Sequence, residues 1–357
     1  MDSIPHSGAQ LARAFHRDAV APLLRRELPG LRYTAGRLGS GSDVLGLDDA
    51  MSRDHDWGCR LTLLVDAADR PVLPRLADVL CQGLPERYQG LPVAFSTTWD
   101  GTVSHRVGAS TVAEFAVSRL GVDPLAGLST VDWLVLTGQS VLEVTGGPVF
   151  LDGTGEWSLV RRALRWYPPD VERYVLGAGW QRLAQQFPLM GRTGQRGQEL
   201  GSRIIAATLA EDLVRLAFLL HRRWAPYRKW REAMFASLPG AGDLAGPLAQ
   251  LVSASGWRDR ESAAVAAAEA LLRVQRERGL PTPEVAITPF FDRPYRTVDP
   301  AVPAALLAAV TDPGIRALPP GVGSVEQWVD SVDVLTHAQR RAALADAYRS
   351  WSPGGGD

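Results

Sequence analysis

The sequence predicts an α+β fold: a small mixed β-sheet with flanking helices over residues 1–125, followed by an α-helical bundle over residues 126–350. Two observations support this prediction. In the first third, short apolar runs of strand length alternate with segments of helical periodicity. After Pro124 the pattern changes to longer helical segments separated by glycine and proline. The chain of 357 residues is long enough for two domains that each bury a core.

The predicted elements of the first domain follow from local patterns. Leu11, Phe15 and Leu24 lie on one side of an amphipathic helix predicted over residues 8–28. Residues 31–42 lead from a strand into a turn, and residues 54–65 form the next strand because they end in an apolar run. A helix over 75–84 and strands over 92–97 and 104–109 follow, and Thr111-x-x-Glu114 is a capping box that opens a helix ending near residue 120.

The second domain is predicted to be helical throughout. Its central helix is expected around residues 204–220, because leucines recur there at helical spacing. Residues 281–300 form a Pro-rich connector that carries Phe290 and Phe291. The helices are expected over residues 131–144, 158–166, 170–187, 199–223, 227–237, 244–255, 260–279, 301–311 and 324–350, the last with a break near Thr336.

Composition excludes several classes of protein. Hydrophobic residues make up 46% and charged residues 22%, as in folded globular proteins. A net charge of −1 argues against general nucleic-acid binding, which requires a basic excess. The sequence shows no transmembrane run and no signal-peptide core, so we expect a cytoplasmic protein without a membrane partner. Cys59 and Cys81 are too few for a disulfide framework and are expected to be buried, reduced thiols.

The most informative segment joins a Gly-Ser turn to a pair of aspartates. Eleven residues separate Gly41-Ser42 from Asp54, and Asp56 follows two positions later. In a strand, Asp54 and Asp56 would point to the same face, where two carboxylates repel each other unless a cation lies between them. Such hard oxygen ligands suit Mg²⁺, and a Gly-Ser turn can bring backbone N–H groups and a hydroxyl to a phosphate. A pair of metal-binding carboxylates beside a phosphate-binding turn indicates nucleotidyl transfer.

These residues resemble the signature of the polymerase-beta-like nucleotidyltransferase superfamily, in which Gly-Ser precedes Asp-x-Asp by a similar distance. Gly46 and Ser52 also match the pattern. The resemblance implies that Asp54 and Asp56 hold Mg²⁺ (or Mn²⁺) and that Gly41, Ser42, Gly46 and Ser52 contact a nucleoside triphosphate, with ATP as the expected nucleotide. An unidentified acceptor, expected to be a small molecule, would receive the nucleoside monophosphate and pyrophosphate would be released.

Four later segments resemble a group of bacterial proteins in which a nucleotidyltransferase-like core precedes a helical domain of unknown function. In this superfamily such a bundle closes one side of the cleft and recognises the acceptor. The segments identify a family without assigning a substrate. They are Asp132-Trp133-Leu134, Thr145-Gly146-Gly147-Pro148-Val149-Phe150, Trp166-Tyr167-Pro168 and Ala225-Pro226-Tyr227-Arg228-Lys229-Trp230.

The chain departs from the superfamily pattern at the third acid. The strands predicted over 92–97 and 104–109 hold no acid, although Asp100 lies in the turn between them. Relatives that act on aminoglycosides use a distant glutamate as base, and Glu143 is the corresponding candidate here. Its alternative is an ordinary carboxylate at a helix end, and Asp152 is a further candidate. With two acids alone, either substrate phosphates hold a second metal or catalysis is impaired.

Lys229 is the single lysine among 38 basic residues. A lysine that survives a strong bias toward arginine can mark a position that needs a compact ammonium, such as a contact with a triphosphate. The alternative is a chance survivor on a helix surface. We therefore include Lys229 among the predicted nucleotide-binding residues.

Two functions from different classes stay open. The first is an enzyme that transfers a nucleoside monophosphate from a metal–NTP complex to an acceptor. The second is a non-catalytic nucleotide-binding or regulatory module on the same fold. The Gly-Ser turn and the aspartate pair favour the enzyme, whereas the missing third acid favours the module.

Overall fold

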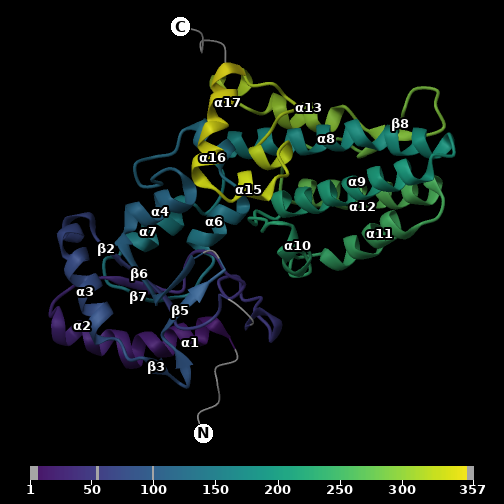
Figure 1. The fold of residues 1–357 in the computed structure, drawn as a ribbon. Helices are drawn as coiled ribbons and strands as arrows, with labels where there is room; N and C mark the ends of the chain where they lie inside the picture. The colour runs from purple at the N-terminus through teal and green to yellow at the C-terminus, as the bar shows by residue number, and fades with distance from the viewer. Residues whose placement is uncertain (1–6, 54–55, 99, 352–357) are drawn as a thin grey trace. The chain divides into compact units, whose positions relative to one another are not determined.

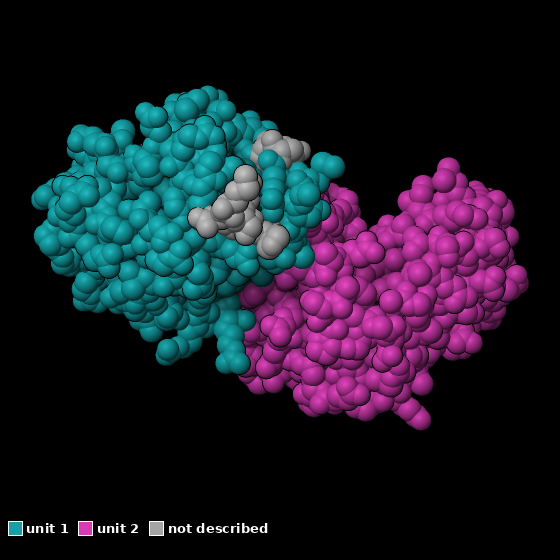
Figure 2. Space-filling model, turned by 90° about the horizontal axis from the view of Figure 1, so that it is seen from below, with its two compact units in different colours: residues 1–128, 139–165 teal, residues 129–138, 166–357 magenta. Residues whose placement is uncertain are grey.

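The computed structural model describes residues 7–53, 56–98 and 100–351, and its contacts divide the chain into two compact units. Unit 1 comprises residues 1–128 and 139–165, and unit 2 comprises residues 129–138 and 166–357 (Figure 2). The chain first leaves unit 1 after residue 128, close to the predicted boundary at residue 125. Residues 139–165, which we assigned to the second domain, return to unit 1.

Unit 1 is built on a five-stranded sheet in the order β5-β6-β2-β1-β7 (Figure 1). β2 and β6 run parallel, and every other neighbouring pair is antiparallel. The sheet is therefore mixed, as predicted. Its strands are β1 (Thr34–Gly36), β2 (Arg60–Val65), β5 (Ala94–Thr97), β6 (Asp100–Thr111) and β7 (Val149–Asp152), and a separate pair is formed by β3 (Arg87–Tyr88) and β4 (Leu91–Pro92).

Alternation along β2 directs Leu61, Leu63 and Val65 to one face of the sheet, where they share a core with the first three helices. These helices are α1 (Gly8–Phe15) and α2 (Ala21–Glu27), joined by a π-helical turn over His16–Val20, and α3 (Leu73–Gly83), which follows a 3₁₀ turn over Ala67–Val72. On the other side of the sheet (Figure 1) lie α4 (Val112–Leu120), α6 (Gly138–Thr145) and α7 (Glu156–Ala163). The predicted capping box opens α4: the Thr111 hydroxyl accepts the Glu114 N–H, and the Glu114 carboxylate accepts the Thr111 N–H.

Unit 2 is a helical bundle centred on the long α8–α9 pair, with α11, α12 and α13 packed around it. Leu209, Leu213, Leu216 and Leu220 of α9 are buried, as the leucine spacing predicted. Its elements are α5 (Thr130–Val135), α8 (Pro169–Gln195), α9 (Glu199–Leu220), α10 (Arg228–Phe235), α11 (Ala241–Ser253), α12 (Trp257–Glu277), α13 (Ala301–Ala308), α14 (Pro313–Arg316), a 3₁₀ turn (Val325–Gln327), α15 (Val332–Leu335), α16 (Ala338–Ala343), α17 (Ala345–Trp351), and the hairpin of β8 (Ile287–Pro289) and β9 (Arg296–Val298).

Several predictions about individual elements were wrong. The strand predicted over 54–65 begins only at Arg60, because Asp56 and Gly58 have positive φ angles of 59° and 152° that an extended strand does not allow. The helix predicted over 131–144 is interrupted after α5, where Leu136 is extended. The predicted Pro-rich connector contains the β8–β9 hairpin. Cys59 is buried as expected, but Cys81 is exposed.

No helix within the described ranges is long and apolar enough to cross a membrane.

Candidate functional site

The Gly-Ser turn follows β1 and is tightly folded. The N–H groups of Val44 and Leu45 donate to the carbonyl oxygens of Gly41 and Ser42, three residues earlier, and Leu47 also donates to Ser42. Gly39 and Gly41 have φ angles of 89° and 142°, which side chains with a Cβ rarely adopt. The predicted turn is thus present, and its glycines are required by its backbone conformation.

A buried ion pair braces this turn from inside. Arg37 Nε and Nη2 donate to the two carboxylate oxygens of Asp43 at 2.6 and 2.8 Å, and both side chains are almost fully buried. The same guanidinium donates to the carbonyl oxygens of Leu38 and Ser40 at 2.8 Å. Arg37 therefore fixes both ends of the turn, a role that the sequence analysis missed.

The glycine motif near residue 147 supports the turn from the other side. The Arg37 N–H donates to the carbonyl oxygen of Pro148 at 3.0 Å, and the Gly39 N–H donates to that of Glu143 at 2.8 Å. A Cβ on Gly147 would lie 1.8 Å from the Arg37 carbonyl oxygen, so only glycine fits there. This contact explains why Gly146-Gly147 belongs with the Gly-Ser turn although it lies a hundred residues away in sequence.

The turn contains four consecutive N–H groups that are unbonded among the described residues. Among the described residues, the N–H groups of Ser40, Gly41, Ser42 and Asp43 make no hydrogen bond, and neither does the Ser42 hydroxyl. When successive residues of a turn alternate between right-handed and left-handed backbone conformations, their N–H groups converge and form an anion-binding concavity called a nest. Ser42 is half-buried, which lowers the competition from bulk water. The turn is therefore suited to bind phosphate oxygens.

Arginines surround the nest. A Cβ on Gly39 would lie 3.3 Å from Arg119 Nη2, so the guanidinium of this α4 residue lies against the turn. Arg60, the first residue of β2, lies within electrostatic range of Arg37, Arg119, Asp43 and Asp56. Burial, and next the positive charge of Arg37, lower the pKa of Arg60 to about 10. Within the described ranges Arg60 pairs with no carboxylate, which leaves its charge available to a bound anion.

The predicted base, Glu143, lies beside the turn on α6. Its backbone carbonyl accepts the Gly39 N–H. Its carboxylate is nearly buried, with Oε2 at 3.5 Å from Arg119 Nη1 and Oε1 accepting from Gln139 Nε2 at 3.2 Å. The structure thus brings Glu143 to the site and also gives its carboxylate two structural partners.

The aspartate pair is only partly described. Asp54 and the neighbouring His55 lie outside the described residues. Asp56 precedes β2, and its Oδ1 accepts the Thr98 N–H at 2.6 Å while its Oδ2 has no hydrogen-bond partner among the described residues. Our expectation that Asp56 projects from a regular strand is wrong, because its left-handed backbone ends the extended conformation. Its free Oδ2 nevertheless suits a hard cation.

The other predicted contacts fall at the rim of the turn. Gly46 is exposed and has a φ of 70°. The Ser52 hydroxyl and N–H both donate to Asp49 Oδ1, at 3.0 and 2.9 Å, so Asp49 holds a turn. Asp48 accepts the N–H of Gly8. Ser52 would have to release Asp49 to contact a nucleotide.

The remaining acids have structural partners. Asp100 accepts from Arg106 Nη1 at 2.9 Å and from the Thr102 N–H, which stabilises the start of β6. Asp152 accepts from the hydroxyls of Thr34 and Ser158 at 2.8 and 2.6 Å. Within residues 7–53, 56–98 and 100–351, no group of three or more His, Cys, Asp or Glu side chains is arranged to hold a metal ion.

Lys229 belongs to unit 2, at the start of α10. Its side chain is exposed, and Nζ lies 4.7 Å from the centre of the Trp230 ring. A cation over an aromatic face gains about 0.5–1 kcal/mol at an exposed position. This contact accounts for the position of the side chain without a ligand, and the predicted nucleotide contact stays a prediction.

Comparisons with known proteins give two matches. A family model described as a domain of unknown function, DUF4037, matches residues 133–231. This range contains nearly all of the four segments that resemble a helical domain of unknown function. Among solved structures, a nucleotidyltransferase-like protein from Exiguobacterium sibiricum 255-15 has 16% sequence identity, 75% coverage of each chain and a TM-score of 0.30. No curated protein matches.

Proposed function

We propose that the chain is a nucleotidyltransferase that transfers a nucleoside monophosphate from a metal–NTP complex to an acceptor. One observation supports the proposal: among the described residues, the N–H groups from Ser40 to Asp43 are unbonded, and Arg60, which pairs with no carboxylate there, lies within electrostatic range of Asp43. Backbone donors and guanidinium groups together recognise phosphate oxygens. The buried Arg37–Asp43 pair keeps this arrangement in place before a ligand arrives.

In this proposal, different residues contact different parts of the triphosphate. The Ser42 hydroxyl and the adjacent N–H groups bind the terminal phosphates, and Arg60 neutralises their charge. Asp54 and Asp56 would hold Mg²⁺ or Mn²⁺, which supplies charge neutralisation at the attacked phosphorus and at the leaving pyrophosphate. The free Oδ2 of Asp56 supports this assignment.

The transfer itself forms a bond between an acceptor oxygen or nitrogen and the α-phosphorus, and breaks the bond to pyrophosphate. Glu143 is the proposed acceptor of the proton that the attacking group loses, since its backbone bonds to Gly39 of the turn. Arg119 and Gln139 hold its carboxylate, so the proton transfer requires at least one of these contacts to loosen. The acceptor is proposed to be a small molecule.

A non-catalytic nucleotide-binding module is the second candidate. The partners of Glu143, Asp100 and Asp152 favour it, because a carboxylate held by hydrogen bonds is a poorer base. Both candidates require nucleotide binding at the Gly-Ser turn. They differ in whether pyrophosphate is released.

The first experiment measures nucleotide affinity by calorimetry with ATP, GTP, CTP and UTP, each with Mg²⁺ and with a chelator. We expect Mg²⁺-dependent binding in the parent, and loss of that dependence in Asp54→Asn and Asp56→Asn. In the Asp56 variant the amide oxygen can still accept the Thr98 N–H, so the fold is kept. Asp78→Asn, which changes an exposed aspartate of α3, is the matched control.

Pyrophosphate release then separates the two candidates. Mg²⁺-dependent release in the presence of small hydroxyl and amine compounds supports transfer. Tight binding without release from any compound favours the module. If none of the four nucleotides binds, or if both aspartate variants bind like the parent, the proposed site is wrong.

A further inference from the structure

A groove in unit 2 lies between α9, α10 and α11. It has a volume of about 650 Å³, which is in the range of pockets that bind small molecules. Its walls are mainly apolar: Val214 from α9, Phe235 from α10, and Ala245, Leu248 and Val252 from α11. The small side chains of α11 keep the groove open, since alanine and glycine occupy most of that wall.

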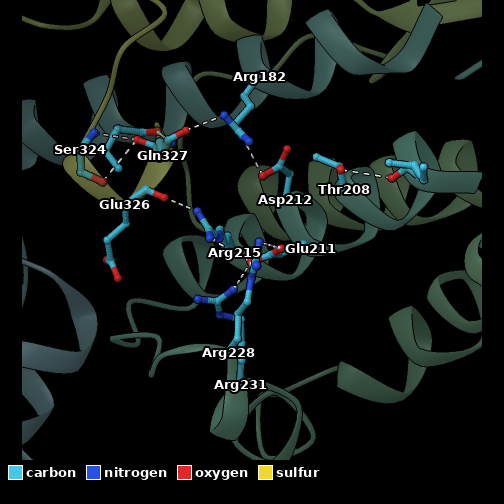
Figure 3. Close-up of polar contacts among 12 residues, drawn as sticks. Arg182, Thr208, Glu211, Asp212, Arg215, Arg228, Arg231, Ser324, Glu326 and Gln327 are labelled. Atoms are coloured by element: carbon cyan, nitrogen blue, oxygen red, sulfur yellow. Dashed lines mark hydrogen bonds and ion pairs between the residues drawn. The ribbon is translucent and has the colours of Figure 1, made fainter. Parts of the chain in front are cut away.

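Three residues that line the groove, Glu211, Arg228 and Arg231, belong to a cluster of charges (Figure 3). Glu211 of α9 accepts hydrogen bonds from Arg215 at 2.9 Å, from Arg228 at 2.9 and 2.7 Å, and from Arg231 at 2.5 Å. These contacts outweigh the effect of burial and lower the pKa of Glu211 to about 2. Glu211 is therefore ionised, and both of its carboxylate oxygens accept hydrogen bonds from arginines.

Two guanidinium nitrogens remain available to a ligand. Among the described residues, Arg228 Nη1 and Arg231 Nη2 have no hydrogen-bond partner, and both arginines line the groove. The Arg228 side chain is 56% exposed, whereas that of Arg231 is 10% exposed, so one donor lies at the mouth and the other lies deeper.

Other acids lie near these arginines. Glu232 is an exposed groove residue, and the charge of Asp330 acts on Arg228. Asp212 pairs with Arg182 at 2.8 Å. Glu326 accepts the Gly138 N–H; burial raises its pKa, while the charges of Arg215 and Arg231 lower it. This part of the groove therefore attracts an anion through the two free guanidinium nitrogens and not through a net positive charge.

We propose that this groove binds a small amphipathic carboxylate, with its apolar body against α11 and its carboxylate between Arg228 and Arg231. A carboxylate can accept from two guanidinium groups at once, which fixes its orientation. The apolar walls select against a purely polar anion such as phosphate. This inference is independent of the proposed nucleotidyl transfer, because it involves other residues.

The test measures the binding of decanoate, decylamine and decanol to the full chain by calorimetry, below the concentrations at which these compounds aggregate. We expect decanoate to bind at least about tenfold more tightly than the other two, as charge-assisted hydrogen bonds predict. Arg228→Gln should remove most of this preference. Arg273→Gln, at an exposed position of α12, is the matched control and should bind like the parent.

A second set of variants fills the groove. Ala245→Trp and Val252→Trp should each abolish decanoate binding, whereas Ala304→Trp, on an exposed position of α13, should not. An unchanged thermal unfolding temperature shows that a variant has folded. Two positions are tested so that one variant remains informative if the other fails to fold. The proposal is wrong if decylamine or decanol binds as tightly as decanoate, or if decanoate does not bind the parent. It is also wrong if Ala245→Trp and Val252→Trp both bind decanoate as tightly as the parent does. A groove that accepts only an apolar helical peptide would also overturn it.

Discussion

Arg37 and Asp43 form a buried, two-bond ion pair across the base of the Gly-Ser turn, with donor–acceptor distances of 2.6 and 2.8 Å. Two charges removed from water need good geometry and further hydrogen bonds to be tolerated, and Arg37 has both. The pair explains how a turn with unbonded N–H groups keeps its shape. It also makes the turn sensitive to small changes on its inner side.

Gly41→Ala should therefore destabilise the protein. A Cβ at this position would lie 2.3 Å from Asp43 Oδ1 and 2.4 Å from Arg37 Nη2, and the φ of 142° is itself unfavourable for alanine. Breaking a buried pair costs about 3–5 kcal/mol, and partial relaxation reduces this to about 2–4 kcal/mol. Urea unfolding measures the loss. Gly46→Ala, where a Cβ meets nothing within 4 Å, should cost less, and an equal loss in both would contradict the packing argument.

Ser42→Ala tests the phosphate contact without disturbing that pair. We expect triphosphate affinity to fall by about 1–2 kcal/mol, the usual effect of removing one hydrogen-bonding group. Ser40→Ala is the control: it removes an exposed hydroxyl from the same turn and leaves its N–H in place. Calorimetry with Mg²⁺–ATP compares the two variants. Equal losses of affinity in the two variants would contradict a phosphate contact specific to the Ser42 hydroxyl.

Arg60→Met should separate stability from binding. Burial lowers the pKa of Arg60 to about 10, so the folded state holds this charge at a cost. Removing the buried charge stabilises the fold, and losing the hydrogen bond to the Asp56 carbonyl offsets part of this gain. We expect a net rise of about 1–2 kcal/mol in the free energy of unfolding. Triphosphate affinity should fall at the same time.

Arg26→Met is the control for Arg60→Met, since it removes a charge from an exposed position of unit 1. It should change neither the free energy of unfolding nor the affinity. If Arg60→Met left triphosphate affinity unchanged, Arg60 would not belong to the site.

Glu211→Gln should change how stability depends on pH. The folded-state pKa of Glu211 is about 2, below its ordinary value of 4.5, so ionised Glu211 stabilises the fold above about pH 4.5. This stabilisation is lost as the pH falls toward 2. At pH 7 the variant should be less stable by about 2–3 kcal/mol, and the difference from the parent should shrink below pH 4.5. Thermal unfolding between pH 2 and pH 7 tests this, and a difference independent of pH would contradict it.

Lys229 tests the argument from lysine scarcity. Its exposed position over Trp230 predicts that Lys229→Ala and Lys229→Arg change stability by less than about 0.5 kcal/mol. If Lys229 contacts the triphosphate, both variants lose nucleotide affinity, because a planar guanidinium does not replace a compact ammonium. Parental affinity in the arginine variant would show that the scarcity of lysine carries no functional information.

The helices could be predicted because their apolar residues recur at helical spacing and glycine or proline marks their ends. The sequence gives weaker signals for short strands. β7 has only four residues, follows Gly146-Gly147-Pro148 and shows no alternation of burial. Asp56 was assigned to a strand because an apolar run follows it. Its left-handed backbone is accompanied by the close approach of Gly58 to the Phe95 ring, a contact that local pattern cannot reveal.

The candidate site was predicted in part. The Gly-Ser turn and Glu143 were identified, and the structure places them together. Arg37, Arg60 and Arg119 were missed, since 37 arginines in the chain make no single one conspicuous. A search for arginines close to the turn in sequence would have found Arg37. Only the fold brings Arg119 of α4 to the same place.

The strand β7 has a consequence for synthesis of the chain. It pairs with β1, yet it is translated after residues 129–138, which belong to unit 2. While the ribosome makes this protein, the outer edge of β1 stays unpaired until the chain has begun its second unit. The glycines that hold Arg37 arrive equally late. The nascent N-terminal segment therefore carries an open sheet edge and an unsupported turn, so we expect neither the sheet nor the proposed nucleotide site to form co-translationally before residue 152 has emerged.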